Sequence, residues 1–132
     1  MQAHTIQVRV YYEDTDFSGA VYHANYLRFM ERGRTEYLRA CGVEQGAAMT
    51  GRAGEAFGFV VRAMTIDFLR PARMDDLLTI ETTPVEMKAA SFELLQRVLR
   101  GDEVLATAKV RCACVINGRA ARIPKGIKEA ME

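Results

Sequence analysis

Residues 25–41, NYLRFMERGRTEYLRAC, decide the fold because their apolar side chains recur at spacings of three and four. This period predicts an amphipathic helix with one face on a core. The predicted stripe and its flanking residues are Leu27, Met30, Arg34, Leu38, Cys41, Tyr26, Phe29 and Tyr37. Gly33 lies inside the helix, where glycine costs about 1 kcal/mol relative to alanine. We therefore expect another element to approach the helix closely at Gly33.

The flanking sequence is rich in strand-like runs. Five strands are predicted, at residues 5–12, 57–69, 76–88, 91–100 and 103–117. Alternation of apolar and polar residues, or β-branched density, supports each run. Turn dipeptides at 101–102 and 117–118 favour antiparallel neighbours. Pro84 predicts a bulge or an edge position.

One long helix followed by a run of strands indicates a single α+β domain over residues 1–132. The helix is expected to lie on one face of the sheet. Residues 45–56, rich in Gly and Ala, are predicted to form a loop or a short helix. Several apolar residues are left for the outer face of so long a sheet, and oligomerisation would cover them.

The composition limits the classes of function. Lys and Arg number 18 and Asp and Glu 17, a balance that argues against non-specific nucleic-acid binding. The chain shows no signal peptide and no membrane-spanning apolar run, which predicts a cytoplasmic protein. Cys112 and Cys114 share one face of a predicted strand, so they are expected to be core residues. With only two histidines, no metal site or other cofactor is expected.

The candidate site lies where a turn meets the helix, with Asp16 seven residues before His23. Gly19 permits a tight turn or a close approach of the backbone to a ligand. Free N–H groups at the helix start can polarise a carbonyl oxygen, and a nearby carboxylate can attack that carbonyl or activate water. Asp is also common in turns, and Asn25 is a good helix cap, so the spacing alone leaves a structural role open.

Contiguous motifs around this site resemble a known family. EDTD (13–16), SGAVYHANYL (18–27), ERGRTEYLR (31–39) and FVVRAMTIDFLRPARMDDLLTIET (59–82) resemble acyl-CoA thioesterases of the 4-hydroxybenzoyl-CoA thioesterase type. The similarity is greatest to the YbgC-like branch, which is associated with the Tol–Pal envelope system. The resemblance implies a hotdog fold, in which a five-stranded antiparallel sheet wraps one long helix. It also implies homodimers that pair sheets edge to edge, joined as tetramers, with active sites at the dimer interface.

The resemblance also assigns roles by position. Asp16 is the catalytic carboxylate, acting as nucleophile or as general base for water. The backbone N–H of His23 binds the thioester carbonyl oxygen, and its imidazole assists. Glu31 matches an acidic position that orients water or a partner residue, although helix carboxylates are often only solvated or paired. Asp14 is expected to hold the loop.

Substrate contacts are expected from Gly19, Tyr22, Lys88 and Ser91. Tyr22 is placed to shape the acyl pocket beside His23. Lys88 and Ser91, in the turn EMKAAS, match a family region that meets the coenzyme A nucleotide. This turn carries neutral alanines where some members have basic residues, so Arg62, Arg70 and Arg73 are alternative phosphate contacts.

Two other functions stay open at this stage. One is a hotdog-fold enoyl-thioester hydratase, and the other is a non-catalytic protein that binds acyl thioesters or an envelope complex. The GxSxG motif of α/β-hydrolases is absent from the sequence. The expected substrate is acyl-CoA, with acyl-carrier protein as a further candidate, and the expected location is the cytoplasm, close to the inner membrane.

Overall fold

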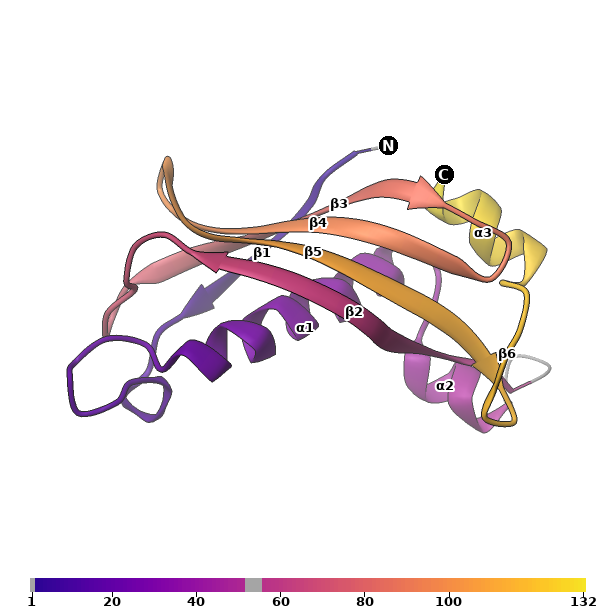
Figure 1. Ribbon diagram of the computed structural model, residues 1–132, viewed down its shortest axis with the longest axis horizontal. Helices are drawn as coiled ribbons and strands as arrows, with labels where there is room; N and C mark the ends of the chain where they lie inside the picture. Colours follow the sequence, from indigo (N-terminus) through magenta and orange to yellow (C-terminus); the bar gives the residue numbers. More distant parts are fainter. Residues whose placement is uncertain (1, 52–55) are drawn as a thin grey trace.

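The fold is an antiparallel sheet curled around one long helix (Figure 1). The computed structural model describes residues 2–51 and 56–132. In these residues the strands are β1 (His4–Arg9), β2 (Gly58–Phe68), β3 (Leu77–Met87), β4 (Ser91–Arg100), β5 (Glu103–Ile116) and β6 (Arg119–Ala120). The helices are α1 (His23–Ala40), α2 (Gln45–Thr50) and α3 (Lys125–Met131), with a 3-10 turn at Tyr12–Asp14.

The sheet has the strand order β1-β3-β4-β5-β2, and β6 pairs with β5. All five predicted strands are present, and the predicted α+β arrangement with the helix on one sheet face is confirmed. The strand predicted at 5–12 was too long, because the chain turns into the 3-10 helix after β1. The register shifts between Pro84 and Glu86, which is the bulge that Pro84 predicted.

Helix α1 begins at His23, before the predicted start at Asn25. Its buried face consists of Asn25, Tyr26, Phe29, Met30, Gly33, Tyr37 and Leu38. Leu27 was predicted in the stripe, but its side chain is 39% exposed, so that assignment was wrong. The sheet covers the stripe centred on Phe29 and Met30, which turns Leu27 toward solvent.

Gly33 lies where the helix and the sheet approach each other closely, as predicted. A Cβ there would lie 2.8 Å from Ile80 Cγ2 and 3.1 Å from Gln96 Nε2. The buried Gln96 side chain donates hydrogen bonds to the Met30 carbonyl and to Thr82 Oγ1, each 2.9 Å long. The absence of a side chain at Gly33 thus lets α1 sit directly on β3 and β4, which fixes where its first turn lies.

The cysteines behave as core residues. All three thiols are free, and Cys112 and Cys114 are buried, as predicted. Burial raises the pKa of the Cys112 thiol, so this thiol stays protonated at neutral pH. Among the described residues, no helix combines the length and the apolar character needed to cross a membrane.

Candidate active site

A closed loop brings Asp16 back toward the start of α1. The Asp16 N–H donates to the Ala20 carbonyl at 3.0 Å, and the Gly19 N–H donates to the Asp16 carbonyl at 3.0 Å. Gly19 has φ +87°, a left-handed conformation that glycine adopts without strain. Thr15 and Val21 pair as a β-bridge and close the base of the loop.

Asp14 anchors this loop, as expected. Its Oδ2 accepts the Tyr11 N–H at 2.8 Å, and its Oδ1 accepts the Asn25 side-chain amide at 2.9 Å. Its carbonyl accepts the Tyr22 N–H at 2.9 Å. The buried carboxylate therefore ties the segment before the loop to the first turn of α1.

Asp16 is exposed, and its charge is stabilised locally. Its Oδ1 accepts the Ser18 N–H at 2.9 Å and also the Ser18 hydroxyl. These two bonds, helped by the nearby His23, hold the pKa of the Asp16 carboxyl below its ordinary value. Asp16 is therefore ionised at neutral pH, and its other oxygen lies outside this pair of bonds.

The start of α1 offers free backbone donors. Tyr22 is the N-cap and makes no side-chain capping bond, and no acidic residue occupies the first turn. The Asn25 N–H donates to the Tyr22 carbonyl at 2.8 Å. Within the described chain, no hydrogen bond from the N–H groups of His23 or Ala24 is found. These N–H groups lie at the positive end of the helix dipole, where an oxyanion is stabilised.

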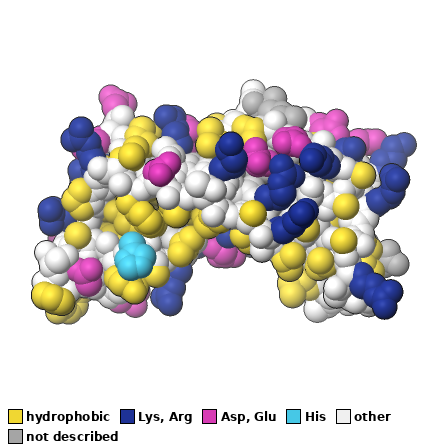
Figure 2. Space-filling view, viewed as in Figure 1, with side chains coloured by type: hydrophobic (Ala, Val, Ile, Leu, Met, Phe, Trp, Pro, Cys, Tyr) yellow, Lys and Arg dark blue, Asp and Glu magenta, His cyan; other side chains and the backbone are white. Residues whose placement is uncertain are grey.

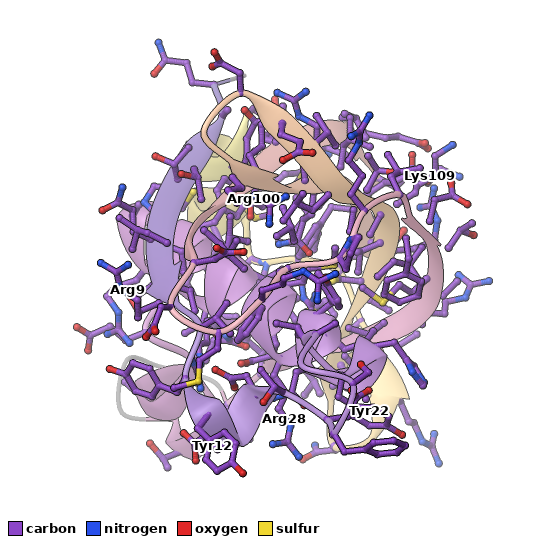
Figure 3. All side chains as sticks on the ribbon, turned by 90° about the vertical axis from the view of Figure 1, so that its left-hand side faces the viewer. Arg9, Tyr12, Tyr22, Arg28, Arg100 and Lys109 are labelled. Atoms are coloured by element: carbon purple, nitrogen blue, oxygen red, sulfur yellow. The ribbon has the colours of Figure 1, made fainter. Side chains whose placement is uncertain are left out.

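A hollow of about 270 Å³ lies beside His23. Val21, His23, Tyr26, Phe68, Leu69, Arg70 and Pro71 line it. The His23 ring lies 4.5 Å from the Tyr22 ring and 6.2 Å from the Phe68 ring, measured between centroids. Figure 2 shows hydrophobic side chains gathered around a histidine at the left-hand end of the molecule, and Figure 3 looks onto that end, with Tyr22 at its surface.

Within one chain the structure does not bring Glu31 to Asp16. Glu31 is exposed, accepts the Thr35 hydroxyl at 2.9 Å, and lies two turns, or about 12 Å, along α1 from His23. It lines a different hollow of about 130 Å³, together with Phe59 and Val60 near the Gly58 end of β2.

Lys88 and Ser91 lie farther away still: Lys88 is in the turn between β3 and β4, and Ser91 is the first residue of β4. The loop that carries Asp16 is joined to the segment just before the opposite end of β3, since Ala20 pairs with Arg73 and the Val21 N–H donates to the Ala72 carbonyl at 2.8 Å. Eleven residues of strand, about 35 Å, separate the two ends. Lys88 pairs with Glu86 at 3.4 Å, and Ser91 is buried, with Arg111 donating to its hydroxyl at 3.3 Å.

Two features of the site were not predicted from the sequence. Ser18 was assigned no role from the sequence, whereas its N–H and hydroxyl both donate to the Asp16 carboxylate. A serine two residues after an aspartate is a turn signal that could have indicated this contact. Phe68 and Arg70 line the hollow from the far end of β2. Arg70 was expected only as a phosphate contact, and no local pattern connects either residue with His23.

Comparison with known proteins gives the family. Residues 10–131 match the sequence model of the thioesterase-like superfamily. The chain belongs to this superfamily. It is 44% identical over 125 residues to the acyl-CoA thioesterase YbgC of Haemophilus influenzae, covering 93% of this chain and 90% of the relative. It is 43% identical over 123 residues to the acyl-CoA thioester hydrolase YbgC of an Escherichia coli strain, covering 91% and 89%.

Solved structures agree with this membership. A probable thioesterase from Bartonella henselae is 48% identical, with a TM-score of 0.89 over 93% of this chain and all of that chain. The 4-hydroxybenzoyl-CoA thioesterase from Pseudomonas is 25% identical, with a TM-score of 0.87 over 98% of this chain and 99% of that one. The expected hotdog fold is thus confirmed, and β6 is a short addition to its five long strands.

Proposed function

We propose that this protein hydrolyses acyl-CoA thioesters, releasing a carboxylic acid and coenzyme A. The observation that carries the proposal is a closed loop that returns an ionised Asp16 carboxylate, under the electrostatic influence of His23, toward the helix start with its free N–H groups. The names of the relatives that share over 40% of their residues with this chain support the choice of acyl-CoA.

The chemistry follows from this arrangement. The thioester carbonyl oxygen accepts hydrogen bonds from the His23 and Ala24 N–H groups, which stabilise the negative charge that develops there. Asp16 either attacks the carbonyl carbon, forming an anhydride that water then hydrolyses, or takes a proton from the attacking water. The coenzyme A thiol has a pKa of about 8.5, so it leaves as a thiolate and needs no acid to protonate it. The His23 imidazole and the Tyr22 ring flank the acyl group.

We include a homodimer in this proposal, because β2 is an outer strand and has no neighbouring strand on one side. Val60 and Val61 on this strand are each 47% exposed. Antiparallel pairing of two β2 edges puts the Phe68 end of one copy beside the Gly58 end of the other. The first end carries the Asp16 and His23 site, and the second carries the Glu31 hollow and the turn after β3.

Each composite site would then take Asp16 and His23 from one copy, and Glu31, Lys88 and Ser91 from the other. Glu31 orients the attacking water, and Lys88 meets a phosphate, although its pairing with Glu86 weakens that contact. A pair of such dimers completes the expected tetramer. Acyl-carrier protein as an alternative thioester substrate, and a cytoplasmic location near the inner membrane, stay predictions.

A mixing experiment tests the composite site. Asp16→Asn and Glu31→Gln proteins are each expected to be nearly inactive in thiol release from acyl-CoA. Random exchange of subunits in an equal mixture makes half of the dimers mixed. In each mixed dimer, one of the two sites takes Asp16 from the Glu31→Gln copy and Glu31 from the Asp16→Asn copy, so that site has both native carboxylates. Restored activity should correspond to about a quarter of the sites in the mixture. If mixing restores nothing although mass spectrometry detects the mixed dimer, Glu31 does not act across the interface.

The reaction itself is tested by thiol release from a panel of acyl-CoA thioesters, short to long and with one aromatic member. We expect release from at least one member by the native protein and by Asp102→Asn, whose exposed carboxylate lies in the turn between β4 and β5. Hydration of an enoyl-CoA without thiol release would contradict the proposal and identify a hydratase. Binding without turnover of any acyl-CoA or acyl-carrier protein would identify a binding protein.

A further inference from the structure

A larger hollow lies at the opposite end of α1 from His23. Its volume is about 630 Å³, within the range of small-molecule binding sites. It is bounded by the end of α1, by α2, and by the segment that leads from β6 into α3. Figure 1 shows these elements together at the right-hand end of the molecule, away from the loop that carries Asp16.

This hollow is separate from the proposed active site. It shares no lining residue with the hollows beside His23 and Glu31. Phe57 faces it, whereas the next aromatic along β2, Phe59, faces the Glu31 hollow, and the two rings contact each other edge to face at 5.7 Å. Helix α2 also separates the two hollows, because Gln45 lines the Glu31 hollow and Ala47 lines the larger one.

The walls are apolar and incompletely covered. Val43, Ala48 and Ile123 are buried, whereas Phe57 and Ile127 are only half-buried and line the hollow. Aliphatic and aromatic walls of this kind gain stability when a hydrocarbon chain displaces water from them.

The rim carries an excess of positive charge. Arg39 and Arg122 line the hollow, and Glu44 is the acidic residue among its lining side chains. Arg39 donates to Glu36 at 3.2 Å and lies 4.0 Å from Glu44. In the described part of the chain, no carboxylate oxygen lies within 4.0 Å of the exposed Arg122 guanidinium. A guanidinium at the mouth of an apolar hollow matches a carboxylate at the end of an alkyl chain.

We infer that this hollow binds a linear aliphatic carboxylate, with the alkyl chain against Phe57, Ile123 and Ile127 and the carboxylate at Arg122. The ligand is a free fatty acid, whose single carboxylate matches the one rim guanidinium, that of Arg122, with no carboxylate partner in the described chain. The site therefore lies outside the proposed hydrolytic centre and does not require turnover.

Calorimetric titration with decanoate, below its micelle concentration, tests the inference on the native protein and on Asp16→Asn. Both should bind one decanoate per chain with equal affinity, and decanol should bind at least about tenfold more weakly because it lacks the charge. Arg122→Glu should weaken decanoate binding by about tenfold or more. Arg119→Glu, on the same hairpin but outside the hollow, is the charge-matched control and should leave the affinity unchanged.

A second variant tests the apolar wall. Ala47→Phe projects a ring into the hollow and should abolish decanoate binding while leaving thermal unfolding near that of the native protein. If this variant does not fold, the decanoate affinities of Arg122→Glu and Arg119→Glu test the inference by themselves. The inference is overturned if decanoate binding does not saturate, if Arg122→Glu and Arg119→Glu bind alike, or if S-decyl coenzyme A, a non-hydrolysable thioether, displaces decanoate competitively.

Discussion

Replacing Gly33 with alanine should destabilise the protein, although alanine is the better helix former. The added Cβ would lie 2.8 Å from Ile80 Cγ2 and 3.1 Å from both Gln96 Nε2 and Thr82 Oγ1. All three neighbours are fully buried, so none can swing away into solvent. The helix propensity of alanine contributes about 1 kcal/mol of stability, whereas overpacking a dense core costs about 1–3 kcal/mol.

Displacing Gln96 adds to this cost, because its amide donates to Met30 and Thr82. Each such bond contributes about 1 kcal/mol. The net free energy of unfolding should therefore fall by about 1–4 kcal/mol. Urea unfolding followed by circular dichroism measures it. Since α1 carries His23 at its start, a helix lifted from the sheet should also lose thioesterase activity.

Gly46→Ala is the matched control for this prediction. A Cβ at Gly46, in α2, meets no atom within 4 Å, so only the propensity gain should remain. The free energy of unfolding should stay unchanged or rise by up to about 1 kcal/mol. If Gly33→Ala proves as stabilising as Gly46→Ala, close contact between α1 and the sheet is not what fixes the helix.

Three further predictions concern the loop and the helix start. Asp14→Ala should lower the free energy of unfolding by about 3 kcal/mol, measured in urea, because it removes the partner of the buried Asn25 amide. Ser18→Ala should shift the acidic limb of the pH–activity profile to higher pH. The bonds from Ser18 lower the pKa of Asp16, so their removal raises it. Because activity requires ionised Asp16, activity is lost as the pH falls through the pKa of Asp16. An unshifted limb would mean that another group controls it. His23→Ala should reduce kcat less than Asp16→Asn does, because the backbone N–H survives the change. The opposite ranking in steady-state assays would assign the main role to the imidazole.

Much of the fold follows from local periodicity. A period near 3.6 in residues 25–41 and the strand-like runs elsewhere predicted α1 and the five long strands. Gly33 predicted close packing, because glycine inside a helix is costly unless its lack of a side chain is used. Periodicity does not decide between adjacent stripes of one helix. The curl of the sheet determines which stripe is buried, so Phe29 is buried and Leu27 is exposed.

The candidate site was predictable only where its parts are close in sequence. Asp16, Gly19, Tyr22 and His23 belong to one turn and one helix start, so local rules place them together. Glu31, Lys88 and Ser91 entered through family resemblance, and the fold puts them at distances that a single chain does not bridge. Helix α3 was not predicted either, although Ile127 and Met131 lie four residues apart and pack onto the core.

The most direct test of the account is the kcat/KM of Asp16→Asn on the acyl-CoA that the native protein hydrolyses fastest, measured by thiol release beside Asp102→Asn. We expect a loss of about a thousandfold or more for Asp16→Asn, with its fold and oligomeric state intact, and native activity for Asp102→Asn. Equal thiol release by Asp16→Asn and the native protein would contradict it, because the carboxylate at the helix start would then not be the catalytic group.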